Sequence, residues 1–118
     1  MRLTLPFPPP VNGLYRNTKD RGGRAKTAKY KAWQFDAGAS LAIQRRSHVG
    51  GRVAGPVHLA FVFGRPDKRK RDLDNLLKAP IDLLVAQGVI DDDRDVHCIV
   101  ARWSDEIEGV EIVVSTAG

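Results

Sequence analysis

An alternating segment followed by a helix-spaced segment most constrains what this chain can fold into. From Val57 to Phe63 every second residue is a large apolar one, which is typical of a strand with one buried face. From Leu73 to Val85 the apolar residues recur at helical spacing, and Gly88 is a suitable residue to end that helix. Pro80 lies inside this second segment, so we expect a kink or an irregular start there.

The remaining apolar segments complete the pattern. Residues 3–7 predict a short strand that the three prolines after it end, and residues 27–46 predict a helix. Residues 96–103 and 110–114 predict two further strands, which we expect to form a hairpin. The sequence therefore predicts an α/β (α+β) fold, with two main helices packed on a mixed sheet of about four strands in two layers.

Length and composition narrow the class of protein. The chain has 118 residues, and we predict a single domain over 1–118. Its 19 Lys and Arg against 14 Asp and Glu give a net charge of +5. Such a balance favours an anionic partner, with nucleic acid ahead of a membrane surface.

Other classes are excluded by what the sequence lacks. A single cysteine, Cys98, rules out a disulfide framework and a multi-cysteine zinc site, which favours a cytoplasmic location. No apolar run approaches the ~20 residues that a membrane span needs. The start of the chain has no long apolar segment behind its charge, so we expect no signal peptide.

The charged residues are unevenly distributed. Residues 16–31 hold seven basic side chains and one acid, and residues 65–71 hold five basic side chains and one acid. We expect both segments to contact DNA phosphates without reading bases. The glycines and charges of residues 12–26 predict a mobile loop. Seven aspartates gather between residues 72 and 95.

These aspartates have the spacing of a metal site. If the segment is extended, the side chains of Asp72 and Asp74 share one face. If the helix has already begun, Asp74 lies in its first turn, where the helix dipole stabilises a carboxylate. Lys78 follows four residues later, on the same face of a helix. A loop returning along the helix would bring one of Asp91–Asp93 back toward the pair.

Carboxylates gathered in this way favour one kind of chemistry. Three of them at one point repel each other and need a cation. Ligands that are all oxygen select Mg²⁺ or Mn²⁺ over zinc. A metal beside basic residues suits a phosphodiester substrate, because it activates water while a lysine neutralises developing charge.

Each acid also has a structural interpretation. Asp72 alone is better explained as a helix N-cap, Asp91–Asp93 as a solvated turn, and Asp82 as a solvated residue of the polar helix face. A calcium loop that begins with the aspartate triplet is excluded, because Val96 and Arg102 stand where Gly and Glu are required. Taken together, the aspartates beside the five basic residues of residues 65–71 favour a nuclease site over separate structural roles.

Other chemistry-bearing side chains give weaker signals. We expect Trp33 and Phe35 in the core and Cys98 packed as a small hydrophobe within a strand. Tyr15 and Tyr30 flank the first basic segment, where they can contact exposed bases. The histidines share no ligand spacing and are expected at core or surface positions: His48, His58 and His97.

Two groups of motifs resemble one known family. Residues 66–76, with Arg-Asp-Leu-Asp-Asn at their end, then Lys78, residues 88–90 and the pair Asp92–Asp93, resemble the RusA family of Holliday junction resolvases. The start of the chain, with Leu-Pro-Phe-Pro-Pro, Asn12 and Tyr-Arg, is similar to that family's amino-terminal signature. The resemblance spans nearly the whole chain.

The resemblance implies a RusA-like homodimer that depends on Mg²⁺, with Mn²⁺ a possible substitute. The family makes paired symmetric nicks in four-way DNA junctions, in recombination and repair, and is common in phages and prophages. By position, Asp72, Asp74 and Asp93 are the catalytic carboxylates, Lys78 the catalytic lysine and Asp92 a further candidate metal ligand. The extra acid Asp91 leaves the ligand among the three consecutive aspartates open.

The leading hypothesis is therefore a structure-selective DNA endonuclease that is nucleoid-associated when bound to DNA. A four-way junction has two-fold symmetry, so a symmetric dimer would supply two active sites. The alternatives are a non-catalytic architectural DNA-binding protein and a nuclease for flaps or single strands. The residues expected to contact DNA are Asn12, Arg16, Lys19, Arg21, Arg24, Lys26, Lys68, Arg69, Lys70 and Arg71.

Overall fold

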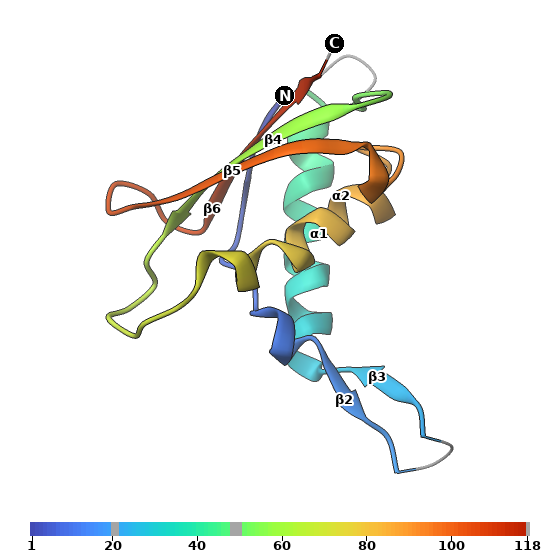
Figure 1. Ribbon diagram of the computed structural model, residues 1–118, viewed down its shortest axis with the longest axis vertical. Coiled ribbons are helices and arrows are strands. Elements are labelled where there is room, and N and C mark those ends of the chain that lie inside the picture. The colour runs from blue at the N-terminus through green and yellow to red at the C-terminus, as the bar shows by residue number, and fades with distance from the viewer. Residues whose placement is uncertain (20–21, 48–50, 118) are drawn as a thin grey trace.

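Four strands of the described chain form one mixed sheet. The computed structural model describes residues 1–19, 22–47 and 51–117. The strand order is β1–β6–β4–β5, in which β6 is antiparallel to β1 and β4 while β4 and β5 are parallel. Figure 1 shows the sheet, whose strands are β1 (Arg2–Leu5), β4 (Val57–Gly64), β5 (Val96–Ser104) and β6 (Val110–Thr116).

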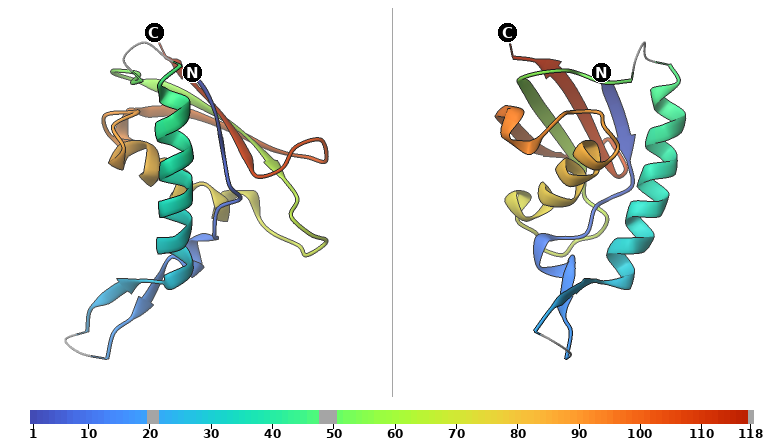
Figure 2. Two further views of the ribbon diagram at one scale, coloured as in Figure 1. Left: turned by 180° about the vertical axis from the view of Figure 1, so that it is seen from behind. Right: turned by 90° about the vertical axis from the view of Figure 1, so that its right-hand side faces the viewer.

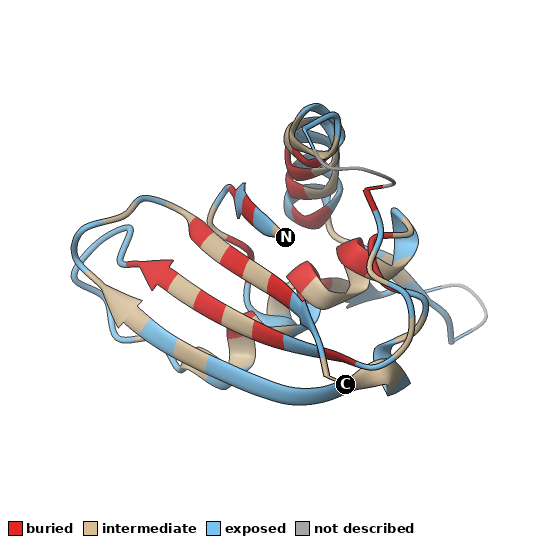
Figure 3. Cartoon of the chain, turned by 90° about the horizontal axis from the view of Figure 1, so that it is seen from above, coloured by how far each residue is buried: buried red, intermediate tan, exposed pale blue. Residues whose placement is uncertain are grey.

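Both main helices lie on one side of this sheet (Figure 2). They are α1 (Ala28–Arg45) and α2 (Lys78–Ala86). Burial alternates along the central strands, as Figure 3 shows, and Leu59, Phe61 and Phe63 of β4 point into the core. The predicted two-layer α+β domain with a mixed four-stranded sheet is confirmed.

Helix α1 begins where the sequence predicts. The hydroxyl of Thr27 caps it by accepting a hydrogen bond from the backbone N–H of Tyr30 at 3.1 Å. Phe35 is 78% exposed, so its predicted core position is wrong. Tyr30 is buried instead of free to contact bases. The buried stripe of the helix is Tyr30, Trp33, Ala37 and Leu41.

The second predicted helix forms in two pieces. A 3₁₀ helix, η2 (Leu73–Leu76), precedes α2. Pro80 is the third residue of α2, a position whose backbone N–H has no partner within the helix in any case. The expected irregular start is therefore confirmed. Gly88 ends the helix at φ +73°, and its N–H donates to the carbonyl of Val85 at 3.0 Å.

Strands β5 and β6 do not form the predicted hairpin. Strand β4 lies between them, parallel to β5 and antiparallel to β6. Their connection passes the end of β4, where the N–H of Gly64 donates to the carbonyl of Gly109 at 2.8 Å. The parallel pair is joined instead through η2 and α2, as a parallel connection requires.

The position of β5 at the sheet edge corrects another expectation. Residues 97–100 are all exposed, including Cys98, because β5 is hydrogen-bonded to a neighbouring strand on one side only. His58 and His97 also lie on the surface, while His48 is outside the described residues. No described helix is long and apolar enough to cross a membrane.

The predicted mobile loop contains a small second sheet. After the 3₁₀ helix η1 (Val11–Gly13), strands β2 (Tyr15–Asn17) and β3 (Arg24–Lys26) pair antiparallel. Figure 1 shows this pair projecting away from the main sheet. Its short, charged strands lack the apolar alternation that would have predicted them. Edge-to-face packing of Tyr15 on Tyr30, at 5.9 Å, joins its base to α1.

Candidate active site

Asp72 and Asp74 lie on the connection between β4 and α2, and both are exposed. Asp72 occupies the N-cap position of η2, but its side chain makes no capping hydrogen bond. The capping role that was the structural alternative for Asp72 is therefore wrong. Neither carboxylate takes part in an ion pair among the described residues. Both are therefore open to a ligand.

A hollow of about 360 Å³ adjoins Asp72. It brings Asn12 from the amino-terminal segment together with Lys70 and Arg71 of the basic loop. These residues, far apart in sequence, were predicted to contact DNA. Asn75 also lines the hollow, and its N–H donates to the carbonyl of Asp72 at 3.2 Å. The sequence interpretation gave Asn75 no role, although its place directly after Asp74 was a signal.

Lys78 lies in the first turn of α2 and is ion-paired one turn further along the helix. Its Nζ donates to Asp82 Oδ1 at 3.2 Å. The break between η2 and α2 at Leu77 removes the continuous helix that would have set Lys78 above Asp74. Asp82 is thus the partner of this lysine and not simply solvated.

The three consecutive aspartates have three different environments. Asp91 accepts hydrogen bonds from Arg52 at 2.8 Å and from the N–H of Gly55 at 3.3 Å, which together lower the pKa of Asp91. Asp92 caps the 3₁₀ helix η3 (Asp93–Asp95). The backbone N–H of Arg94, with its guanidinium, lowers the pKa of Asp92 to about 2. Asp93 is exposed and has no ion pair among the described residues.

One copy of the described chain does not gather the predicted carboxylates. Within residues 1–19, 22–47 and 51–117, no group of three Asp, Glu, His or Cys side chains is placed to hold a metal ion. Asp72 and Asp74 precede α2, whereas Asp93 follows it. A helix of nine residues is about 14 Å long, and Figure 1 shows the two segments at its opposite ends. The donor chemistry fits Mg²⁺, but the full set is not assembled.

The basic loop before Asp72 is organised by its one acid. Asp67 accepts two hydrogen bonds from Arg71, at 2.5 and 2.9 Å, and one from the N–H of Arg69 at 2.9 Å. These bonds, chiefly those from Arg71, hold the pKa of Asp67 well below its usual range. The sequence interpretation counted Asp67 only as a lone acid. The loop that leads to Asp72 therefore has an internal clamp.

Aromatic rings support both ends of that loop. The guanidinium of Arg65 lies 4.4 Å from the ring centroid of Trp103 on β5, and that of Arg71 lies 5.5 Å from the centroid of Phe7. The rings of Phe7 and Trp103 are stacked, with centroids 6.3 Å apart. Cation–π contacts on a shared aromatic pair thus fix where the loop begins and ends.

Comparison with known proteins shows the family of this chain. The family model described as Endodeoxyribonuclease RusA matches residues 6–115. The chain belongs to the RusA family. A crossover junction endodeoxyribonuclease RusA from Escherichia coli is 37% identical over 94 residues, which are 80% of this chain and 74% of the relative. Relatives with the same name in Enterobacteria phage 82 and Shigella sonnei are 36% and 35% identical over the same shares of the chains.

In this RusA-family chain the first basic segment lies mainly on the projecting strands. Arg24 lies over the ring of Tyr15 at 4.8 Å, and Lys26 lies 5.6 Å from the ring centroid of Tyr30. Arg16 and Lys19 are exposed, as are Lys68, Arg69 and Lys70 in the second segment. Arg21 is outside the described residues. The basic side chains of the two segments therefore lie mainly on the projecting strands and on the loop before Asp72, with Lys29 and Lys31 on α1.

Proposed function

We propose that this chain is a crossover junction endodeoxyribonuclease that hydrolyses phosphodiester bonds in four-way DNA junctions. One observation carries the proposal. Asp72 and Asp74 are exposed carboxylates outside every ion pair of the described residues, although Lys70 and Arg71 line the hollow beside Asp72. Acids that served only structure would be expected to bind such neighbours. The activity for which the relatives are named supports the same function.

The chain's own residues have distinct tasks in this proposal. Lys70 and Arg71, with Asn12 across the hollow, hold the phosphate backbone next to Asp72. When DNA binds, Lys78 leaves its ion pair with Asp82 and neutralises negative charge on the phosphate. Asp72, Asp74 and Asp93 are the proposed Mg²⁺ ligands. Bound Mg²⁺ supplies a Lewis acid that polarises the phosphate and lowers the pKa of water.

The position of Asp93 leads us to propose that a second copy completes each site. Asp72 and Asp74 of one protomer would meet Asp93 of its partner in a two-fold dimer. The dimer would then contain two equivalent sites, which matches the two strands that must be cut in a symmetric junction. It also accounts for three carboxylates that one copy keeps apart.

Cleavage of a labelled four-way junction, compared with a linear duplex of the same sequence, tests the function. With Mg²⁺ we expect paired nicks near the crossover, and no cleavage with EDTA or of the duplex. Tight binding without cleavage in any divalent metal would instead support the architectural protein. Equal cleavage of flaps or single strands would support the broader nuclease.

A mixing experiment tests the shared site. Asp74→Asn and Asp93→Asn are each expected to be inactive alone. In a mixed dimer one site would carry both substitutions and the other neither, so nicking of one strand should return. If each protomer built its own site, every site in the mixture would be defective and no activity would return.

A further inference from the structure

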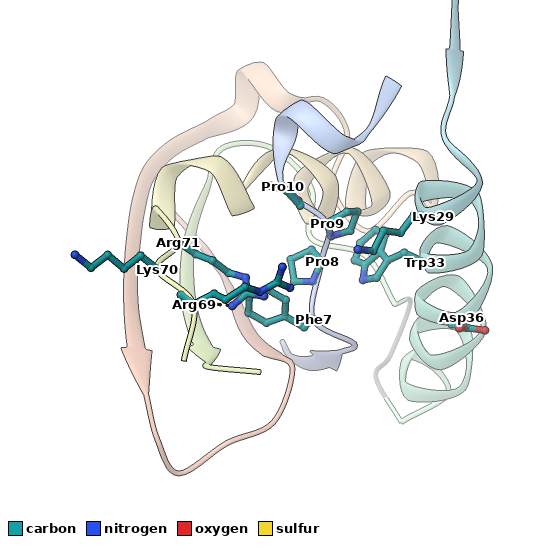
Figure 4. Close-up of a pocket in the computed structure, with 10 residues that line it drawn as sticks. All are labelled: Phe7, Pro8, Pro9, Pro10, Lys29, Trp33, Asp36, Arg69, Lys70 and Arg71. Carbon is teal, nitrogen blue, oxygen red and sulfur yellow. Dashed lines mark hydrogen bonds between the residues drawn. The ribbon is translucent and has the colours of Figure 1, made fainter. Parts of the chain in front are cut away.

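A larger cavity of about 470 Å³ lies next to the hollow that contains Asp72. Its floor is apolar, formed mainly by Phe7, Pro8 and Pro9 of the amino-terminal segment. Figure 4 shows this floor between two walls, with Lys29 and Trp33 of α1 on one side and the arginines of the basic loop on the other.

The cavity and the active-site hollow are neighbours with shared walls. Pro10, Lys70 and Arg71 line both of them. A DNA strand whose phosphate lies beside Asp72 would therefore extend its neighbouring nucleotide into the cavity. The volume lies within the range of about 300–1,000 Å³ that is usual for small-molecule sites, which is enough for one nucleotide.

The charges around the cavity fit an anionic occupant. Lys29 projects over the floor from α1, and Arg69 faces it from the loop (Figure 4). The side chain of Arg69 is 77% exposed, whereas Asp67 and the ring of Phe7 hold Arg71 in the wall at 20% exposure. Asp36, the one acid of the lining, points away from the other labelled side chains. Lys29 takes part in no ion pair of the described residues, and Arg69, whose Nε donates to Asp67 at 3.3 Å, still exposes its side chain toward a phosphate.

The apolar floor identifies the form of the nucleic acid. A base-paired duplex presents phosphates and base edges outward and hides the faces of its bases, so such a floor offers it little. An unstacked base has an exposed face that packs on flat apolar and ring-shaped side chains. At a junction crossover continuous stacking is interrupted, so a base beside the crossover is the easiest one for a protein to unpair.

We propose that this cavity binds one unpaired nucleotide of the junction, adjacent to the phosphate that is cut. The base packs against the floor formed by Phe7, Pro8 and Pro9, where the Phe7 ring also contacts Arg71 and Trp103. Its phosphate lies between Lys29 and Arg69. This inference rests on the proposed function, and it adds a nucleotide subsite that couples cleavage to local unpairing.

An abasic scan combined with an occluding substitution tests the subsite. Junctions that carry a single abasic position near the crossover are measured for binding to the full-length protein and for cleavage in Mg²⁺. Lys29→Trp places an indole over the floor. Lys31→Trp is the matched control, since residue 31 is exposed, does not line the cavity and lies about 200° further round the helix.

We expect one position on each cut strand where base loss weakens binding about tenfold, the range of base-stacking contributions. In Lys29→Trp that dependence should vanish, while Lys31→Trp should keep it. If the wild type cuts junctions but no position matters, or both variants behave alike, the subsite is wrong and the function stands. If the wild type cuts no junction in any metal, the proposed function itself fails.

Discussion

Asp67 accepts hydrogen bonds from both terminal nitrogens of Arg71, at 2.5 and 2.9 Å. Because Arg71 directly precedes Asp72, this pair fixes the chain at the point where the proposed active site begins. The flat ring of Phe7 lies under the same guanidinium. An acid inside the basic loop thus orders the cations around it.

Substitution Asp67→Asn should lower the rate of junction cleavage while leaving binding intact. The amide cannot accept two charged hydrogen bonds, so Arg71 and the adjoining Asp72 lose their fixed positions. Displacements of about 1 Å at a catalytic site cost up to about a hundredfold, and we expect roughly a tenfold lower kcat. Removing a negative charge favours the DNA complex, so KM should not rise. Glu108→Gln, another exposed acid, is the control. A kcat equal to that of the wild type would contradict the clamp.

Asp93 should be needed for cleavage, whereas Asp91 should contribute to the stability of the fold. Asp93→Asn should abolish cleavage without affecting thermal stability. Asp91→Asn should keep cleavage but lower the melting temperature, because Asp91 joins Arg52 and Gly55 to the end of the α2 segment. Activity and thermal unfolding of the two variants, measured side by side, give the answer. Loss of cleavage in the Asp91 variant alone would reverse the assignment.

Asp92 should titrate at unusually low pH. Hydrogen bonds from the backbone and side chain of Arg94 lower its pKa to about 2. Since the folded pKa lies below the unfolded one, the contribution of Asp92 to stability is present above pH 4 and is lost as the pH falls toward 2. Carbon NMR of the carboxyl group would measure this. Arg94→Ala keeps the backbone N–H and removes only the guanidinium, so the pKa should rise in part, and an unchanged value would show that the guanidinium does not contribute.

Gly64→Ala should destabilise the protein at the end of β4. A Cβ there would lie 2.0 Å from the carbonyl oxygen of Ile107, so the connection between β5 and β6 must move. Overpacking of this kind costs about 1–3 kcal/mol. Gly13→Ala is the control, because its Cβ would meet only Pro10 at 3.7 Å. Chemical denaturation of both variants tests this, and equal stability would contradict the close approach.

Local sequence patterns predicted the helices and strands of this fold, but they did not predict which strands pair with each other. The apolar spacing that defines α1 and β4 depends only on neighbours in sequence, and both elements formed there. The insertion of β4 between β5 and β6 depends on which strands meet in space, which alternation within each strand does not specify. The same limit applies to Cys98, whose strand was predicted but whose edge position was not.

The candidate site shows the same division. The spacing of Asp72 and Asp74 beside basic residues predicted a pair of metal ligands next to a phosphate-binding segment, and the structure leaves both carboxylates exposed. The prediction that Lys78 and Asp74 share one helix face assumed a continuous helix, but the helix is broken at Leu77. The clamp formed by Asp67 required a fold-back of the loop that spacing alone does not reveal.

The most direct test of the central claim compares the wild type with Asp74→Asn on a labelled four-way junction in Mg²⁺, measuring cleavage and binding together. The account predicts paired nicks near the crossover for the wild type. It predicts no nicks for Asp74→Asn, with binding at least as tight because a negative charge facing phosphate is gone. Cleavage by Asp74→Asn at the wild-type rate would contradict it.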